Sequence, residues 1–387
     1  RTAFVSTNSI TQGEQVGALW GPLLAKGIKI HFAHQTFRWN NEARGVAAVH
    51  CVIMGFADFD VPKKLLFMYA DESSEPTTHS VGNISPYLVE SVDAVIRSRQ
   101  KPLCHVPSIS FGNMPLDGGG LILSDEEKIN FLIADPTASA FIRPLISARE
   151  FLNGSSRWCL WLVDASPSDL KLHPIIMERI DQVKRFREAS VAPSTRKFAA
   201  TPGLFRDRNN PKTTIAIPRH FSENRGYLTM GFYDQNSIVS DSCMSLPDAS
   251  LFHFGVLSSL MHMAWVRYVC GRIKSDYRYS KDIVYNNYPW PEHLSAAHQQ
   301  AVEAAAQDVL DARAAHPTAS LADLYDPLTM PPDLVKAHQA LDKAVDKCYR
   351  PQPFASDAKR VEYLFELYEK YVAGLLAGVK PKRKKKG

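Results

Sequence analysis

The sequence lacks the features that mark several large classes of protein. It contains no run of 18 uncharged apolar residues, and residues 1–10 lack the layout of a signal peptide, so no membrane contact or export is expected. Its six cysteines stand far apart and form no Cys-x-x-Cys pair. This spacing excludes the usual structural zinc site and indicates a reducing, cytoplasmic setting. At 45% hydrophobic and 22% charged residues, the chain is not wholly disordered.

Several catalytic motifs are also missing. The glycine run at 118–120 is not followed by Lys-Ser/Thr, which excludes a phosphate loop, and no Gly-x-Ser-x-Gly elbow exists. His31 and His34 lie three apart on a predicted strand, so they point to opposite faces and cannot share a metal. One alternative stays open: Asp117, Glu126 and Lys128 imitate a nuclease metal site, although acids at 125–127 equally suit the start of a helix. No metal site is predicted.

What is present begins as an α/β pattern. Apolar spacing predicts a strand at 3–7, a helix at 12–26 and strands at 28–34, 46–56 and 64–69. This order is that of a doubly wound sheet ending in an antiparallel hairpin, but the first strands of such a sheet have no counterpart before Arg1. We therefore expect a truncated Rossmann-like sheet, with an exposed edge at 4–7.

The rest of the chain reads as α+β and then as helical. Residues 108–124 and 190–218 are rich in loop signals. Further elements are predicted as helices at 86–99, 125–134, 168–188 and 251–273, a hairpin at 227–239, and C-terminal helices at 295–315, 332–349 and 356–376.

Charge is segregated along the chain. Residues 185–281 hold 14 Lys/Arg against 7 Asp/Glu, whereas residues 295–379 hold 8 against 12. Residues 380–386 add six basic side chains, which predict a disordered basic tail. A basic segment with interleaved aromatics is typical of a surface that binds a polyanion, and a solvated surface gives the same count.

Four sequence blocks carry a resemblance to a known family. They are FVSTNSITQGEQ at 4–15, the stretch 30–56, DIVYNNYPWP at 282–291 and the stretch 324–349. In this order they resemble the MmeI-like (type IIL/IIG) restriction–modification enzymes, which are single-chain adenine-N6 DNA methyltransferases. The resemblance implies the C-terminal part of a methyltransferase domain at 1–80, a DNA target-recognition domain at 81–292, a helical domain at 293–379 and the tail at 380–387.

The resemblance also implies partners and a cofactor. The full-length parent is expected to use S-adenosylmethionine and to bind double-stranded DNA. The family's Phe-x-Gly-x-Gly loop and Asn-Pro-Pro-Phe/Tyr motif are absent from the 387 residues. We therefore expect this chain alone to hold no cofactor, to be inactive, and to pair with an upstream methyltransferase core of the same parent chain. The alternative is a stand-alone DNA-specificity subunit that docks on a separate methyltransferase.

Two aromatic residues, Phe37 and Trp39, stand in the predicted polar loop at 35–45. One interpretation is that they anchor this loop by packing. By resemblance, the loop matches the region that offers an aromatic face to an extruded adenine, with Phe37 as the first candidate.

Candidates for reading DNA bases lie in the basic segment. In RIKSDYRY at 272–279, Lys274, Asp276 and Arg278 share one face if the segment is extended. A cation beside an acid suits a G·C pair, because the cation donates to guanine and the acid accepts from cytosine. The resemblance adds Arg219 and Asp241 as a second such pair, and surface ion pairs are the alternative. The candidates for phosphate contacts are Arg185, Arg187, Arg196, Lys197, Arg206, Arg208 and Arg225.

Overall fold

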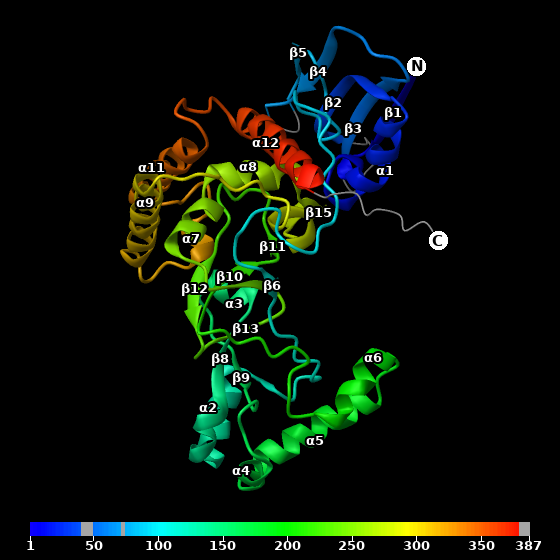
Figure 1. The fold of residues 1–387 in the computed structure, drawn as a ribbon. Helices are drawn as coiled ribbons and strands as arrows, with labels where there is room; N and C mark the ends of the chain where they lie inside the picture. Colours follow the sequence, from blue (N-terminus) through cyan, green and yellow to red (C-terminus); the bar gives the residue numbers. More distant parts are fainter. Residues whose placement is uncertain (40–48, 71–73, 379–387) are drawn as a thin grey trace.

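The computed structural model describes residues 1–39, 49–70 and 74–378. Figure 1 shows a sheet with one helix at the N-terminal end, a long mixed α/β middle region and a cluster of helices near the C-terminus. The remainder of the predicted aromatic loop, residues 40–45, the first residues of the predicted strand 46–56, and the basic tail, residues 380–387, lie outside the described residues. Within the described part, no helix is long and apolar enough to cross a membrane.

The N-terminal sheet has the strand order β1-β3-β2-β4-β5. Strand β3, the second in this order, runs antiparallel to both β1 and β2, while β2 at the centre is parallel to β4. This arrangement confirms the antiparallel hairpin at the end of the sheet. On β1, at the edge, the side chain of Phe4 is 57% exposed. The bounds are β1 Thr2–Thr7, α1 Gly13–Ala25, β2 Lys29–Trp39, β3 Val49–Ala57, β4 Lys64–Met68 and β5 Thr77–Val81.

Helix α1 covers this sheet through two buried side chains, Val16 and Trp20. The Trp20 indole donates a hydrogen bond to the carbonyl of Ile10 over 3.0 Å, which satisfies its one polar atom inside the core. On β3, Gly55 faces the ring of Phe32, and a Cβ at this position would collide with that ring. Glycine is therefore required here for close packing between adjacent strands.

The middle region divides into two lobes. The near lobe contains a sheet of order β12-β10-β14-β6 and a smaller sheet of order β11-β16-β15, and it shares its core with the N-terminal sheet and the C-terminal helices. Its elements are β6 Ser110–Phe111, α3 Ala148–Asn153, β10 Thr213–Pro218, β11 His220–Phe221, β12 Gly231–Asp234, β14 Cys243–Pro247, α7 Leu251–Leu257, α8 Leu260–Val269, β15 Gly271–Ile273 and β16 Asp276–Arg278.

The distal lobe has a sheet of order β13-β8-β9-β7 and a separate hydrophobic core. Figure 1 shows it projecting from the rest of the chain, with α5 and α6 forming an arm. Ile176, Ile180 and Val183 form the buried stripe of α5 at helical spacing. Its elements are β7 Ile122–Leu123, α2 Asp125–Ala134, β8 Ile142–Ile146, β9 Trp158–Leu160, α4 Pro167–Lys171, α5 Pro174–Glu188, α6 Pro193–Arg196 and β13 Ile238–Val239.

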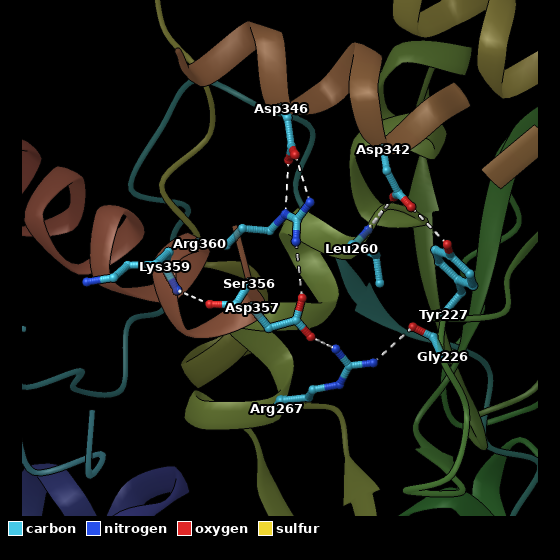
Figure 2. A network of polar contacts seen from close by, with 10 residues as sticks. All are labelled: Gly226, Tyr227, Leu260, Arg267, Asp342, Asp346, Ser356, Asp357, Lys359 and Arg360. Atoms are coloured by element: carbon cyan, nitrogen blue, oxygen red, sulfur yellow. Dashed lines mark hydrogen bonds and ion pairs between the residues drawn. The ribbon is translucent and has the colours of Figure 1, made fainter. Parts of the chain in front are cut away.

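The C-terminal helices pack on the near lobe. Their bounds are α9 Ala296–Ala314, α10 Leu321–Leu324, α11 Pro332–Tyr349 and α12 Asp357–Gly378. Figure 2 shows the polar network between these helices and α8. Arg360 donates to both carboxylate oxygens of Asp346 over 3.0 and 2.7 Å, and Arg267 of α8 forms an ion pair with Asp357. Asp342 accepts from the amide of Leu260 over 2.7 Å and from the Tyr227 hydroxyl over 2.8 Å. These contacts fix the helices to the middle region.

Several sequence predictions of secondary structure are wrong; among them, the single helix predicted at 168–188 is divided into α4 and α5. Residues 86–99 form no helix, because tertiary bonds hold them extended: the side chains of Asn286 and Asn287 donate to the carbonyls of Arg99 and Arg97. The hairpin at 227–239 splits, since β12 pairs with β10 and β13 pairs with β8. The helix at 251–273 breaks after α7, where the Ser258 hydroxyl donates to a preceding carbonyl, and it ends before β15.

Candidate nucleic-acid interface

A cleft of about 1140 Å³ separates the N-terminal sheet from the near lobe. Strands β1 and β2 are parallel to each other because both pair antiparallel with β3, so their carboxyl ends lie at the same edge of the sheet. Open α/β sheets bind ligands at this edge. One wall of the cleft comes from that edge and includes Thr7, Asn8, Ser9, Gln12, Arg38, Val49 and His50. The facing wall comes from the near lobe and includes Arg219, Glu223, Arg272, Lys274, Arg278 and Ser280.

The second wall contains the β15–β16 hairpin. Ile273 pairs with Asp276, so the chain reverses at Lys274 and Ser275, and Lys274 has a left-handed φ of 58°. The expectation that Lys274, Asp276 and Arg278 share one extended face is therefore wrong for Lys274, which lies at the tip. Asp276 and Arg278 do share a face of β16, because the residue between them, Tyr277, points inward and is 2% exposed.

Arg219 lies beside this hairpin. Its carbonyl accepts from the amide of Tyr279 over 2.8 Å, and the next two residues pair with β16. The guanidinium donates to the backbone carbonyl of Asp241 over 2.9 Å and lies over the ring of Phe111, 4.6 Å from its centre. Arg219 and Asp241, which the resemblance implied as a cation–acid pair, thus lie close together, but the contact runs through the Asp241 backbone carbonyl and not its carboxylate. Burial raises the pKa of the Asp241 carboxyl, and the charge of Arg219 opposes that shift.

Phe37 and Trp39 lie on strand β2 rather than in a loop. The Phe37 ring stacks on Tyr69 with centroids 5.4 Å apart, while the side chain of Trp39 is 50% exposed. Neither lines the cleft, but Val49, which pairs with Trp39, does. Trp39 therefore stands at the margin of the cleft and is half exposed.

The candidates for phosphate contacts are scattered. Arg208 is exposed and lines a second hollow of about 460 Å³ with Phe111 and Lys281. Arg185 and Lys197 are exposed near the end of the distal arm. Arg196 donates to the carbonyls of Ser190 and Val191 in its own segment, and Arg206 forms an ion pair with Asp207 over 2.8 Å.

Two of these candidates do not fit the role. Arg187 is fully buried, because its side chain donates five hydrogen bonds to backbone carbonyls, so no phosphate reaches it. Arg225 donates to the carbonyl of Leu321 over 3.3 Å and thus packs toward the C-terminal helices. Burial lowers the pKa of both guanidinium groups. We remove both residues from the set.

The three residues of the nuclease alternative, Asp117, Glu126 and Lys128, do not form a metal site. The Asp117 carboxylate accepts from the amides of Leu121 and Ile122 over 2.7 and 3.2 Å, while the Lys128 ammonium lies 3.0 Å from the centre of the Trp158 ring. Among the described residues, no group of three or more His, Cys, Asp or Glu side chains is placed to hold a metal ion. The acids at 125–127 occupy the first turn of α2, behind the capping residue Ser124.

Sequence reasoning missed several residues of the cleft. Arg38 lies in the segment noted for its aromatic residues, and Arg272 lies in the segment noted for base readout, yet neither was selected. Asn8, Ser9 and Gln12, which follow β1, lie in the block FVSTNSITQGEQ that carries the family resemblance, but nothing in that block marks these three as site residues. Their role in the cleft depends on tertiary structure.

The fold and the cleft define a class: the end of a DNA-methyltransferase sheet joined to a recognition module. Three family models agree with this class. They are described as the MmeI target recognition domain, which matches residues 90–292 and so more than half of the chain, the MmeI C-terminal domain at 284–376 and the MmeI DNA-methyltransferase domain at 1–68. The chain therefore belongs to the MmeI family of type IIL restriction–modification enzymes.

Two relatives give the extent of this similarity. DNA methyltransferase A of Bacillus subtilis (strain 168) is 42% identical over 370 residues, which is 95% of this chain and 41% of that protein. The solved structure of the type IIL restriction–modification enzyme MmeI in complex with DNA has a TM-score of 0.87 and 46% identity, covering 96% of this chain and 50% of that chain. The chain thus spans half or less of the length of these relatives.

The family implies S-adenosylmethionine as the methyl donor of a complete enzyme. The methyltransferase wall of the cleft offers hydroxyl, amide and basic side chains at Thr7, Asn8 and Arg38, and no glycine-rich loop between a strand and a helix. The described residues therefore do not fit the cofactor, and no step of methyl transfer is assigned to them.

Proposed function

We propose that the chain is the sequence-recognition portion of an adenine-N6 DNA methyltransferase and restriction–modification enzyme, and that its cleft binds double-stranded DNA. The observation that carries this proposal is the cleft itself. Its near-lobe wall presents Arg219, Lys274 and Arg278 toward the sheet edge at which methyltransferase-type sheets bind their ligands. Cations that line a groove attract the phosphate backbone and also donate to guanine.

Base readout is assigned to two cation–acid pairs. Lys274 at the hairpin tip and Asp276 on β16 form the first, with Arg278 exposed two residues further on. Arg219 and Asp241 form the second. In each pair the cation donates to guanine O6 or N7 and the acid accepts from cytosine N4, so each specifies a G·C pair. The relative of known structure was solved with DNA, which supports DNA as the ligand here.

The adenine that is methylated is proposed to leave the duplex and stack on Trp39 or Phe37. Trp39 is half exposed, while Phe37 already stacks on Tyr69. Stacking on an aromatic ring contributes about 1–3 kcal/mol per base. In the complete enzyme an upstream core would supply S-adenosylmethionine, and this chain alone is proposed to be inactive.

Phosphate contacts are assigned to the exposed cations, which position the duplex without specifying its sequence. Arg208 is the first of these because it lines the second hollow together with Lys281. Arg185 and Lys197 on the distal arm, with Arg196 and Arg206, are the remaining members of this set.

The test is a binding measurement with the chain of 387 residues. We expect it to bind fluorescent duplexes from a random library at low salt, to weaken as salt rises, and to enrich one sequence over repeated selection. The matched control is the Arg219→Ala, Lys274→Ala double variant, which should keep salt-dependent binding but lose enrichment at two positions. If the chain does not bind duplex DNA at low salt, the proposal is contradicted.

The stand-alone specificity subunit is the second candidate. It is favoured by the exposed edge strand β1, on which Phe4 and Val5 are 57% and 56% exposed. The same edge equally suits a core that belongs to the same chain. The upstream reading frame separates the two, because an Asn-Pro-Pro-Phe/Tyr motif in frame supports the single-chain enzyme.

A further inference from the structure

Arg272 lines the cleft next to the base-reading candidates, but its guanidinium is already engaged. One nitrogen, Nη1, donates to the Glu223 carboxylate over 3.1 Å and to the carbonyl of Ser275 over 2.9 Å. The other, Nη2, donates to the Tyr277 hydroxyl over 3.3 Å, and the group lies 4.3 Å from the centre of the Tyr277 ring. Its side chain is 18% exposed. Little of this cation is left for a phosphate.

The contact with Ser275 bears on the turn at the hairpin tip. Lys274 and Ser275 form a two-residue turn in which Lys274 has a positive φ of 58° and Ser275 does not. Glycine is favoured at the first position of such a turn, since a side chain in this conformation is strained. A lysine here therefore depends on its surroundings, and strain of this kind concentrates at functional sites.

Arg272 contacts the turn and its neighbours on several sides. It sits opposite Tyr277 in the register of the hairpin, reaches forward to the carbonyl that follows Lys274, and is tied to Glu223 outside the hairpin. Tyr277 packs on Phe221 with ring centres 5.0 Å apart. The contacts of Arg272 with Glu223, Ser275 and Tyr277, here called the clamp, are therefore continuous with the core of the near lobe. Arg272 thus links the strained tip to a fixed support.

We propose that Arg272 is a positioning residue for sequence recognition: it holds the turn that presents Lys274 to a base pair, and it contacts neither base nor phosphate itself. This inference rests on the proposed function of the cleft. It makes Arg272 different from Arg219 and Arg278, although all three line the same cleft. A guanidinium suits this role because it can donate in several directions at once within one plane.

The experiment compares base preferences of the whole chain, selected from a random duplex library, for wild type, Arg272→Met and Arg272→Lys. Lys274→Gln first identifies the base pair that depends on Lys274. We expect both Arg272 variants to lose about tenfold in discrimination at that pair and to stay within about twofold elsewhere. The slope of log affinity against log salt should not change. The control, Arg208→Met, removes a charge of the same sign and should lower both affinity and slope without changing preference.

A second readout needs no DNA. Hydrogen exchange of the amides in residues 273–276 should accelerate in Arg272→Met and, to a smaller extent, in Glu223→Gln. Glu223→Gln removes the charge of one partner and so weakens only one contact of Arg272, which covers the case in which Arg272→Met fails to fold. Uniform loss of affinity with a smaller salt slope would make Arg272 a phosphate contact and overturn the proposal. Unchanged preference together with unchanged exchange would overturn it as well. Failure of the wild-type chain to prefer any base would instead remove the proposed function and, with it, the reading role.

Discussion

In the near lobe, Arg219, Lys274 and Arg278 line a cleft, whereas in the distal lobe Arg187 is enclosed by its own chain and Arg179 donates to the carbonyls of Gly119, Gly120 and Ile122. Both sets belong to arginine- and lysine-rich stretches of the middle region. The difference shows that basic residues in similar sequence surroundings can have different roles, one structural and one in ligand binding. Some hold carbonyl-rich loops together, and others keep their donors available for a ligand.

The reason lies in what each lobe has to stabilise. The distal lobe has a small core of its own and connects its elements by loops such as 115–121 and 197–205, whose carbonyls need donors. The near lobe shares a large core with the N-terminal sheet and the C-terminal helices. Its core therefore needs few donors from the cleft cations: Arg272 is engaged within the hairpin and Arg219 donates to one carbonyl, while Lys274 and Arg278 remain at the cleft surface.

The largest expected effect is on the distal lobe. Arg187→Met leaves five backbone carbonyls without their donor, and because an unsatisfied buried acceptor costs about 1–3 kcal/mol, the free energy of unfolding should fall by at least about 3 kcal/mol. Urea denaturation followed by fluorescence measures this loss. The control is Arg185→Met on the same helix, whose side chain is exposed and whose removal should cost less than about 0.5 kcal/mol. Equal free energies of unfolding for the two variants would contradict the structural role given to Arg187.

The next effect concerns the support of the near lobe. Burial raises the pKa of Asp342 to about 6, above the value of about 4 in an unfolded chain. The folded state therefore holds this proton more tightly, so the contribution of Asp342 to stability falls as pH rises from 4 to 6. In the Asp342→Asn variant, Oδ1 can still accept from the amide of Leu260, whereas Nδ2 has to donate to the Tyr227 hydroxyl instead of accepting from it; the side chain no longer titrates.

Between pH 4 and pH 7.5 the wild type should lose about 2–3 kcal/mol of unfolding free energy that the Asp342→Asn variant does not lose, because two pKa units correspond to about 2.7 kcal/mol. Denaturant titrations at several pH values measure this difference. Parallel pH dependence of the two proteins would show that Asp342 is not the group responsible.

A smaller effect separates the lobes by specificity. Arg219→Ala should reduce discrimination at one base pair by about 1–3 kcal/mol, since its guanidinium lies in the cleft. Arg196→Ala in the distal arm should leave discrimination unchanged, because a phosphate contact positions the duplex without specifying its sequence. Competition with duplexes changed at one pair measures both. Equal effects on base preference would remove the distinction between the lobes.

The smallest effect belongs to a phosphate contact. Arg208→Gln should lower affinity by a few-fold for every sequence and reduce the salt slope by about 1. Its position at the second hollow, beside Phe111 and Lys281, places it next to the cleft but outside it. A change confined to one sequence would instead make Arg208 a base contact.

Much of the N-terminal sheet and of the C-terminal helices was predictable, because each has an uninterrupted apolar period. Strand β1 and helices α9, α11 and α12 fall within a few residues of their predicted bounds. The middle region was less predictable. Residues 86–99 have a helix-compatible pattern, but Asn286 and Asn287, nearly 190 residues away in sequence, determine their conformation.

For the site, sequence identified the segment but not the geometry. RIKSDYRY marked the hairpin, yet the turn at Lys274 reverses a segment that was expected to be extended. Arg187 is buried among carbonyls of two segments, 115–116 and 198–204, which are far apart in sequence, so no local pattern predicts this burial. Phe37 and Trp39 were placed in a loop because the polar residues around them conceal the continuation of β2.

The central claim is tested most directly by exchanging the charges of the hairpin. The double variant Lys274→Glu, Asp276→Arg keeps net charge and backbone but reverses donor and acceptor. Selection from a random duplex library with the whole chain should then change one G·C pair of the preferred sequence to C·G and leave the other positions as they were. An unchanged preferred sequence, with binding retained, would contradict the account.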